Sequence, residues 1–333
     1  MTQEWQEKSA LVVGFGSIGR RHARVLKEIG VRDVRVCETI DERRKAAQQE
    51  LGIERVYATL EEGLAENPDT VFICSPTGEH IEQAIAAVQS GADVMIEKPL
   101  STTLEGVDKL KTLASEHERV VMVAHCFRFH DGLLRAKKWL DAGRIGRLVA
   151  VRCLVGEYIP EVMPDYLNRY VSKYSGAYEL MHDIDLALWL AGQKPKRVFG
   201  IDGTFSDVPM ESPDLVEMLI EFQDRCAASV HLDFFQRARR RQTELFGTEG
   251  TIIVEFAKWD ECTASIYEAK KSQWTHKQLK TDRDDMFRAE DRTFLEACVS
   301  RTPVPVDIDA GAQVVKVMLA AQHACKTGQA VEF

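Results

Sequence analysis

The stretch Ala10-Leu-Val-Val-Gly14-Phe-Gly16-Ser-Ile-Gly19 joins two predicted elements and decides how the chain begins to fold. The aliphatic residues before Gly14 predict a short buried strand. Ile18 to Ile29 repeats apolar residues at helical spacing and predicts a helix. The three glycines therefore form a G-x-G-x-x-G pattern between a strand and a helix, the context in which this pattern is informative.

Each glycine of this turn has its own physical role. Gly14 permits a tight turn, Gly16 lets the backbone approach a pyrophosphate, and Gly19 lets the helix pack close to the sheet. The helix N-terminus offers N–H groups and a partial positive charge to that anion. The pattern predicts a dinucleotide site that includes the intervening Phe15, Ser17 and Ile18, whereas a plain turn would need only one glycine.

Glu38 indicates which dinucleotide is bound. It follows the predicted strand Val34 to Cys37, roughly 20 residues after Gly19, where a carboxylate binds the ribose hydroxyls of NAD. It would repel the 2′-phosphate of NADP. Arg43 and Arg44 lie near enough in sequence to attract that phosphate, but a surface helix would place them in solvent. The sequence favours NAD over NADP.

The first third of the chain alternates short strands with helices, which predicts a doubly wound parallel sheet in an α/β fold. We expect residues 1–124 to form this Rossmann domain. Further strands are predicted at 70–74, 93–96 and 120–124, with helices at 41–51, 79–90 and 104–116.

After Ala124 the rhythm changes, and residues 125–333 are expected to form a second, α+β domain with a large open, mainly antiparallel sheet. A helix at 131–142, a strand at 148–155 and an irregular stretch to Gly176 come first. Successive antiparallel strands are then predicted at 216–222, 226–235, 243–246 and 251–256, and a last helix at 310–325.

Composition limits the function classes. The 333 residues are 45% hydrophobic and 29% charged, enough for two globular domains. The mean hydropathy is -0.23, and neither a long apolar run nor an apolar N-terminus is present, so we expect a soluble, cytoplasmic protein. A net charge of -9 disfavours nucleic acid and anionic membranes and favours a small-molecule ligand.

The eight cysteines are scattered without C-x-x-C pairs or zinc-like spacing. We expect reduced thiols that are mostly buried, and no metal site.

Four motifs together resemble the glucose-fructose oxidoreductase / inositol dehydrogenase (Gfo/Idh/MocA) family over essentially the whole chain. They are Gly14 to Gly19, Cys74-Ser-Pro-Thr-Gly-Glu-His80, Glu97-Lys-Pro99 and His182-Asp-Ile-Asp185. The resemblance implies NAD(P)-dependent hydride transfer at a carbinol carbon of a sugar, sugar derivative or cyclitol. It also implies a homodimer or homotetramer assembled through the C-terminal sheet.

The resemblance also assigns residues around the cofactor. Ser75, Pro76, Thr77 and His80 would line its nicotinamide side, and Glu97 would approach the nicotinamide ribose. His125 and Arg128 match the segment that leads from the nicotinamide pocket into the second domain.

Lys98 and His182 are the expected acid/base residues. Dehydrogenating an alcohol removes a proton from oxygen while a hydride leaves carbon, so a base is needed. Lys98 follows an apolar strand at the carboxyl edge of the sheet, where ligands bind. By composition alone it would be a surface lysine on a turn, and the sequence leaves open whether the Lys98-Pro99 bond is cis. A lone histidine such as His182 is more often structural, but its place in the family motif reverses that reading.

Glu179 is the third expected catalytic residue, and here the sequence departs from the common family pattern. An aspartate usually lies four residues before the histidine, but Tyr178 occupies that position. Glu179 lies three residues before His182 and would share a helix face with it. The resemblance extends to a family branch with this spacing and with a segment resembling Tyr158-Ile-Pro160, and some members of that branch act on amino sugars or nucleotide sugars. A sugar derivative is therefore a better expectation than inositol.

Substrate contacts are expected from the irregular loop, at Tyr158, Asp165, Tyr166, Asn168, Arg169 and Tyr174. Tyrosines in a loop can equally pack over a core edge. Strand alternation would put Arg237, Arg239 and Arg241 on one face, where we expect intersubunit salt bridges rather than anion recognition.

Two rival functions remain from the sequence. One is an NAD-dependent glycosidase that uses transient oxidation, and the other is a non-catalytic regulator that senses the cofactor. The presence of both Lys98 and His182 speaks against the regulator, because a sensor needs no proton relay.

Overall fold

A computed structural model describes residues 3–333 and divides them into two compact units. The first unit contains residues 3–126 and 284–315, and the second contains Phe127–Arg283 and Lys316–Phe333. The first crossing lies close to the boundary expected at Ala124. The return of residues 284–315 to the first unit was not indicated by any change of pattern in the sequence.

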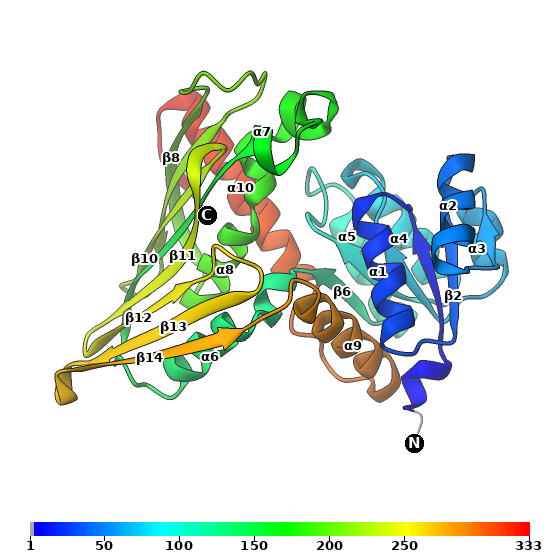
Figure 1. Ribbon diagram of the computed structural model, residues 1–333, viewed down its shortest axis with the longest axis horizontal. Coiled ribbons are helices and arrows are strands. Elements are labelled where there is room, and N and C mark those ends of the chain that lie inside the picture. Colours follow the sequence, from blue (N-terminus) through cyan, green and yellow to red (C-terminus); the bar gives the residue numbers. More distant parts are fainter. Residues whose placement is uncertain (1–2) are drawn as a thin grey trace. The chain divides into compact units, whose positions relative to one another are not determined.

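The first unit contains a parallel sheet of six strands within the described residues, which confirms the predicted doubly wound fold (Figure 1). The strand order is β3-β2-β1-β4-β5-β6, so the order reverses between β1 and β4. Ligands of such sheets bind outside the carboxyl ends of the strands at this switch point. The strands are β1 (Ser9–Val13), β2 (Asp33–Cys37), β3 (Val56–Tyr57), β4 (Thr70–Ile73), β5 (Asp93–Glu97) and β6 (Val121–Ala124).

Helices cover the sheet of the first unit, and one of them comes from late in the chain. Strands β1, β4 and β5 are buried along their whole length, as expected of a parallel sheet with both faces covered. Arg21 and Arg24 of α1 pair with Asp284 at the start of α9, which packs beside α1 (Figure 1). The helices are α1 (Ser17–Glu28), α2 (Asp41–Leu51), α3 (Leu60–Ala65), α4 (His80–Gln89), α5 (Val107–Glu116) and α9 (Asp285–Ser300).

The second unit contains a sheet of nine strands within the described residues, in the order β14-β13-β12-β11-β7-β10-β9-β8-β15. The large, mainly antiparallel sheet is as predicted, with one correction. Strand β7 lies between β10 and β11 and pairs with β10 in parallel, so the predicted strands were not all successive neighbours. The strands are β7 (Leu148–Tyr158), β8 (Pro195–Gly203), β9 (Leu215–Phe222), β10 (Ala227–Asp233), β11 (Phe235–Gly247), β12 (Gly250–Glu255), β13 (Glu261–Glu268), β14 (Gln273–Lys280) and β15 (Val331–Glu332).

Helices α6 (Asp131–Asp141) and α8 (His182–Ala191) pack on one face of this sheet, whereas α7 (Ile159–Val162) lies in the long loop. Helix α10 (Ile308–Thr327) runs from residues of the first unit into residues of the second. The side chains of β9 alternate between buried and exposed, and Leu219 is 57% exposed. Together with Phe199 and Ile201 of β8, it leaves apolar side chains on the open face of the sheet.

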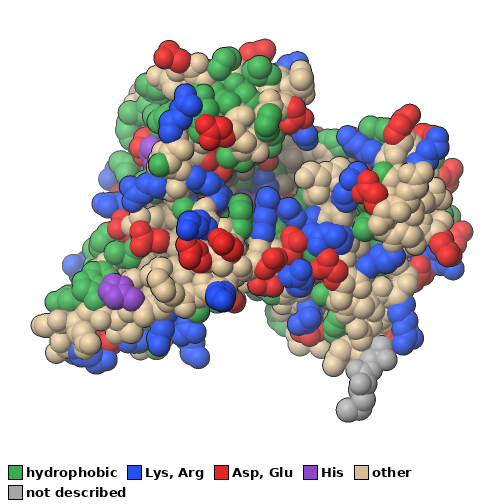
Figure 2. All heavy atoms as spheres, viewed as in Figure 1, with side chains coloured by type: hydrophobic (Ala, Val, Ile, Leu, Met, Phe, Trp, Pro, Cys, Tyr) green, Lys and Arg blue, Asp and Glu red, His purple; other side chains and the backbone are tan. Residues whose placement is uncertain are grey.

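The cysteines are free thiols in the structure, and all but Cys325 are buried. No helix in residues 3–333 has the length and apolar character needed to cross a membrane. On the face of the first unit that is in view, acidic and basic side chains are intermixed rather than gathered into one basic patch (Figure 2).

Candidate active site

The glycine turn connects β1 to α1 at the carboxyl edge of the sheet. Gly14 has a φ of +88°, and a Cβ there would lie 2.8 Å from the carbonyl oxygen of Cys74. A Cβ on Gly19 would lie 1.9 Å from the carbonyl oxygen of Gly14, so the helix could not approach the strand. A Cβ on Gly16 would meet nothing within 4 Å. The first and third glycines serve the protein's own packing, and the second leaves open space where a pyrophosphate fits.

Glu38 is buried beside this turn. Its Oε2 accepts a hydrogen bond from the Phe15 N–H at 2.8 Å, and its Oε1 accepts one from the Ile40 N–H at 3.0 Å. Burial alone would raise the pKa of Glu38, but these N–H groups and Arg43 outweigh it, and the pKa is lowered. The carboxylate is therefore ionised and fixed, as recognition of ribose hydroxyls requires.

Arg44 and Arg43 differ in how they meet Glu38. The Arg44 guanidinium donates to the backbone carbonyl oxygens of Glu38 and Thr39 at 2.6 and 2.9 Å. Arg43 lies 3.4 Å from Glu38 Oε2, and about half of its side chain is exposed. Only Arg43 could turn toward a 2′-phosphate, and Glu38 opposes that phosphate.

The loop after β4 carries Ser75, Pro76 and Thr77 into α4. The Ser75 hydroxyl donates to Gln83 Oε1 at 2.6 Å. His80 does not line this loop but supports it from within. Its Nε2 is 3.0 Å from the Ser75 carbonyl oxygen and its Nδ1 is 2.9 Å from that of Pro99, and its side chain is buried. Its expected place on the nicotinamide side of the cofactor stays a prediction.

The Glu97-Lys-Pro99 motif ends β5 at the same edge of the sheet. The Lys98-Pro99 peptide bond is cis. Glu97 is buried, with Oε1 2.9 Å from His22 Nε2 and Oε2 accepting from the Lys98 N–H at 2.9 Å. Burial alone would raise the pKa of Glu97, but His22 and Lys98 outweigh burial, and the pKa is lowered. Glu97 is therefore ionised. Both oxygens have partners inside the protein, so Glu97 supports Lys98, and its approach to the nicotinamide ribose stays a prediction.

His125 and Arg128, in the segment expected to lead from the nicotinamide pocket into the second domain, are also buried, and their place beside the cofactor stays a prediction. His125 is fully buried at the end of β6. In the second unit, Arg128 donates to both oxygens of Asp185 at 2.9 and 2.6 Å and lies over the Trp189 ring. Arg128 therefore anchors α8, since a bidentate pair of this kind fixes both partners.

His182 is the first residue of α8, and its ring meets the edge of Phe127 at 4.8 Å between centroids. The expected helix does not extend back to Glu179, because residues Gly176–Leu180 form a 3₁₀ turn. The Ser175 hydroxyl donates to Glu179 Oε2 at 3.1 Å. The acid/base roles of both residues stay predictions.

Asp183 and Arg241 form a buried ion pair that sequence reasoning did not identify. The Arg241 guanidinium donates to Asp183 Oδ2 and lies 3.7 Å from the Phe127 ring, the same ring that His182 contacts. Burial raises the pKa of Asp183, and Arg241 opposes that rise. Two features of the sequence could have indicated this pair: the alternation along β11, which points Arg241 inward, and the acidic residue directly after His182.

This pair also corrects the expected role of one member of the arginine cluster. Arg241 is buried against Asp183 and is used within the subunit. Arg239 donates to Glu157 at 3.1 Å, and the intersubunit role of Arg237 and Arg239 stays a prediction. Arg237 stacks on Tyr158, with its guanidinium 3.6 Å from the ring centroid.

The irregular loop presents most of its predicted residues to solvent. Asp165 and Arg169 pair at 2.7 Å, and Tyr174 is 67% exposed and packs on Tyr170. Tyr166 is buried and belongs to the core. The structure thus brings Asp165 to Arg169 and Tyr158 to Arg237.

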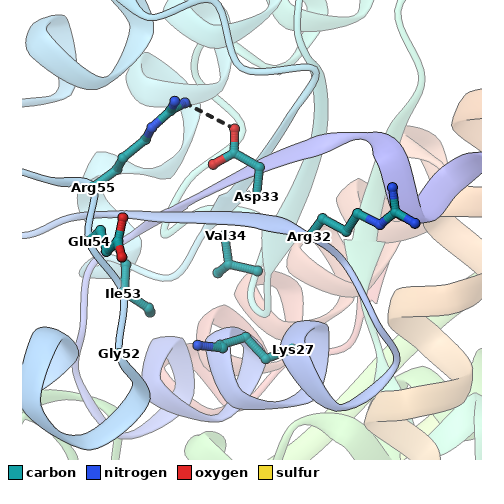
Figure 3. Close-up of a pocket in the computed structure, with 8 residues that line it drawn as sticks. All are labelled: Lys27, Arg32, Asp33, Val34, Gly52, Ile53, Glu54 and Arg55. Atoms are coloured by element: carbon teal, nitrogen blue, oxygen red, sulfur yellow. Dashed lines mark hydrogen bonds and ion pairs between the residues drawn. The ribbon is translucent and has the colours of Figure 1, made fainter.

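A cavity of about 480 Å³ lies elsewhere in the first unit, at the amino end of β2 (Figure 3). Most of its charged side chains already have partners: Arg55 lies 3.1 Å from Asp33, Arg32 pairs with Glu7, and Lys27 donates to the Leu51 carbonyl oxygen. The glycine turn and Lys98 are at the carboxyl ends of the strands. The cavity therefore does not belong to the candidate site. Among residues 3–333, no group of His, Cys, Asp or Glu side chains could hold a metal ion.

Comparison with known proteins identifies the family of the chain. A family model described as "Oxidoreductase family, NAD-binding Rossmann fold" matches residues 8–125, and one described as "GFO/IDH/MocA C-terminal domain" matches residues 133–253. Myo-inositol 2-dehydrogenase of Thermotoga maritima is 26% identical over 340 residues, covering 97% of each chain. The scyllo-inositol 2-dehydrogenase (NAD(+)) of Bacillus subtilis is 28% identical over 339 residues, covering 97% of this chain and 95% of its own.

The fold is shared with solved structures as well. That of myo-inositol 2-dehydrogenase from Lactobacillus plantarum has a TM-score of 0.85 at 23% identity and covers 98% of this chain and 99% of its own. Because both halves of the chain match models of one family, the protein belongs to the Gfo/Idh/MocA family and is an NAD-dependent oxidoreductase.

Proposed function

We propose that this oxidoreductase transfers a hydride between NAD and a carbinol carbon of a sugar, sugar derivative or cyclitol, with Lys98 as the principal acid/base residue. The observation that supports the proposal is how the residues on either side of Lys98 are held. Its neighbours Glu97 and Pro99 are each held by a buried histidine, at the edge of the sheet that also carries the glycine turn. A lysine on an ordinary surface turn needs no such support.

The glycine turn, Glu38 and the loop from Ser75 to Thr77 would hold the cofactor. The N–H groups at the start of α1 suit its pyrophosphate, and the ionised Glu38 suits its ribose hydroxyls. Bound NAD supplies the hydride acceptor.

The substrate hydroxyl must lose its proton as the hydride leaves. Lys98 in its neutral form takes this proton and returns it in the reverse direction. His182 is the second acid/base residue, and Glu179 is its carboxylate partner. Phe127, which lies between His182 and the buried Arg241, supports the orientation of the ring. His182→Ala should cost more turnover than Glu179→Gln, because His182 is the acid/base residue of this pair and Glu179 only tunes it.

The substrate is expected to be an uncharged or weakly charged polyol. Arg169 is already paired with Asp165, so this loop presents little net charge toward a phosphate. Tyr158 and Tyr174 offer ring faces that suit the C–H face of a sugar. The departure at Glu179 favoured a sugar derivative, but two relatives that match the whole chain are named inositol dehydrogenases, so cyclitols rank equally as test substrates.

We also propose that the protein works in the cytoplasm as a homodimer or homotetramer. Phe199, Ile201 and Leu219 give the open face of the second unit's sheet an apolar surface that a second copy would bury. Leu219→Lys should shift the protein to a smaller species in analytical ultracentrifugation.

The test is a panel of cyclitols, sugars, sugar phosphates and nucleotide sugars, each incubated with NAD and followed by absorbance of the reduced nicotinamide. The proposal expects selective turnover of one polyol class, abolished in Lys98→Ala. Product without net nicotinamide reduction would identify the glycosidase, and NAD binding without turnover of any compound would favour the regulator. Equal activity on many unrelated sugars would defeat a specific assignment.

A further inference from the structure

His22 lies at the centre of a buried charged cluster that the proposed proton transfer does not use. It is on α1, just after the glycine turn, and its side chain is 1% exposed. Its Nε2 lies 2.9 Å from Glu97 Oε1, and its Nδ1 lies 2.8 Å from Asp291 Oδ1 on α9. The rings of Phe72 and Phe287 pack against it and exclude water.

The imidazole is flanked by two carboxylates and carries a positive charge. Burial alone would lower the pKa of His22, but hydrogen bonds and charge interactions with Asp291 and Glu97 raise it well above the ordinary value. Glu290 of α9 is buried next to Asp291, and the thiol of Cys74 at the end of β4 interacts with the charges of all three carboxylates. The other cations of the same helix have other partners: Arg21 and Arg24 pair with Asp284, Arg20 pairs with Glu50, and Lys27 donates to the Leu51 carbonyl oxygen. His22 is therefore the cation that balances Glu97 from the α1 side.

Glu97 connects this cluster to Lys98. One oxygen of the Glu97 carboxylate accepts a hydrogen bond from the His22 ring, and the other accepts one from the Lys98 N–H. The positive charge of Lys98 also helps to lower the pKa of Glu97. Both the backbone of Lys98 and the charge near its ammonium thus depend on Glu97.

We propose that His22, held by Asp291, is a positioning residue for Lys98: it fixes and neutralises Glu97, so that Lys98 is held in place and can lose its proton. This inference rests on the proposed function, in which Lys98 exchanges the substrate proton. It assigns α9, which returns from late in the chain, a part in the chemistry.

The proposal predicts how Lys98 responds when the cation is removed. In His22→Gln, the negative charge of Glu97 is no longer balanced, so the Lys98 ammonium holds its proton more tightly. The neutral fraction of Lys98 should then appear about one pH unit higher, a roughly tenfold loss at a given pH below the transition.

Competitive labelling with acetic anhydride measures this response without a substrate, because only neutral amines react. Lys98 is partly exposed, and its acetylation can be followed against pH by mass spectrometry of the digested protein. Lys111, which pairs with Asp309 on the surface, is the internal reference and should keep its midpoint. The kcat/KM of His22→Gln against pH, with the substrate found by the panel, should move its ascending limb in the same direction.

A charge compensation experiment separates this role from a purely structural one. In the double variant His22→Gln with Glu97→Gln, both charges are absent, and the Lys98 midpoint should return to within about 0.3 pH units of the wild-type value. Phe294→Leu is the matched control, because Phe294 is fully buried on the same α9 helix and packs on Phe72. It should lower Tm without moving the midpoint.

Asp291→Asn provides a second test if His22→Gln does not fold. It keeps the shape of the side chain but weakens the cation on His22, so the Lys98 midpoint should rise by less than in His22→Gln. An unchanged midpoint in folded His22→Gln or Asp291→Asn would overturn the inference. Normal turnover of Lys98→Ala would instead overturn the proposed function, so the two failures are distinct.

Discussion

Lys98 and His182 each adjoin a buried carboxylate in the sequence, but the two carboxylates are balanced by different cations. Glu97, before Lys98, is balanced by His22, and Asp183, after His182, is balanced by Arg241. An imidazolium is a titratable cation, whereas a guanidinium is not. Its carboxylate partners raise the pKa of His22 well above the ordinary value, so both carboxylates face a cation at neutral pH, but only the one beside Lys98 faces a cation that can be titrated.

Breaking the fixed pair should have the largest effect. Arg241→Met is expected to lower the free energy of unfolding by about 3–5 kcal/mol, because Asp183 would stay buried without its cation. Burial then raises the pKa of Asp183 further, so the folded state gains a proton more readily than the unfolded state. The loss should be greater near pH 8 than near pH 5, as measured by chemical denaturation at both values.

Arg240→Met is the matched control for this prediction. Arg240 is exposed and donates to Gln242 on the same strand, so its loss should cost less than about 0.5 kcal/mol. Equal losses in the two variants would show that the Asp183 pair contributes no more than a surface contact.

Removing the amine of Lys98, whose neighbour Glu97 is balanced by His22, should affect catalysis rather than stability. Lys98→Ala is expected to lower kcat by at least about 100-fold, the usual scale for a positioned acid or base. Calorimetry should find NAD affinity nearly unchanged, since Glu38 and the glycine turn remain. Lys111→Ala, a surface substitution, should keep full turnover. Near-normal kcat in Lys98→Ala at saturating substrate would remove the proposed role.

Glu38 is a third buried carboxylate, and it differs from Glu97 and Asp183 because backbone N–H groups stabilise its negative charge more than a cation does. Glu38→Ser should weaken NAD binding by about 1–3 kcal/mol, since charge-assisted hydrogen bonds to the ribose are lost. The discrimination against NADP should fall as well, because Arg43 no longer faces a carboxylate. Titration of the variant with NAD and with NADP measures both effects. An unchanged Kd for NAD would place Glu38 outside the cofactor site.

The second unit also holds a histidine between two carboxylates, His231, and its removal should give the smallest effect. His231 on β10 lies 2.8 Å from Asp233 Oδ2 and 2.5 Å from Glu217 Oε1. Hydrogen bonds from the ring to these carboxylates outweigh burial and raise the pKa of His231 to about 9. Its contribution to stability is complete below about pH 6.5 and is lost as the pH rises through about 9.

Because the ring is partly exposed, this contribution should be about 1 kcal/mol. The unfolding midpoint of the wild type should fall between neutral pH and about pH 10 by more than that of His231→Gln. Parallel curves for the two proteins would show that His231 does not contribute.

The sequence predicted those parts of the site that depend on local pattern. The glycine turn, Glu38 and the Glu97-Lys-Pro99 loop each follow a strand directly, so their place at the sheet edge followed from the order of elements. The exposure of individual side chains did not follow, because His80 and Glu97 are buried by contacts with distant residues.

Long-range partners were not predictable from one sequence. His22 and Asp291 are 269 residues apart, and no change of composition indicates that α9 returns to the first unit. The burial of Arg241 against Asp183 depends on the pairing of β11 with β7, whereas the sequence indicated only a series of successive strands. The register of a large mixed sheet is set by packing over the whole unit rather than by local propensity.

The return of residues 284–315 to the first unit also affects how the protein is made. A ribosome adds about 5–20 residues per second, so residues 127–283 keep α9 from its place on α1 for roughly 10–30 s after the last Rossmann strand has been synthesised. During that interval α1 presents to water the face that α9 will later cover, and His22 has no Asp291 to meet. The nascent Rossmann unit is thus an incomplete globule that a chaperone can bind, and it becomes complete only when nearly the whole polypeptide has been translated.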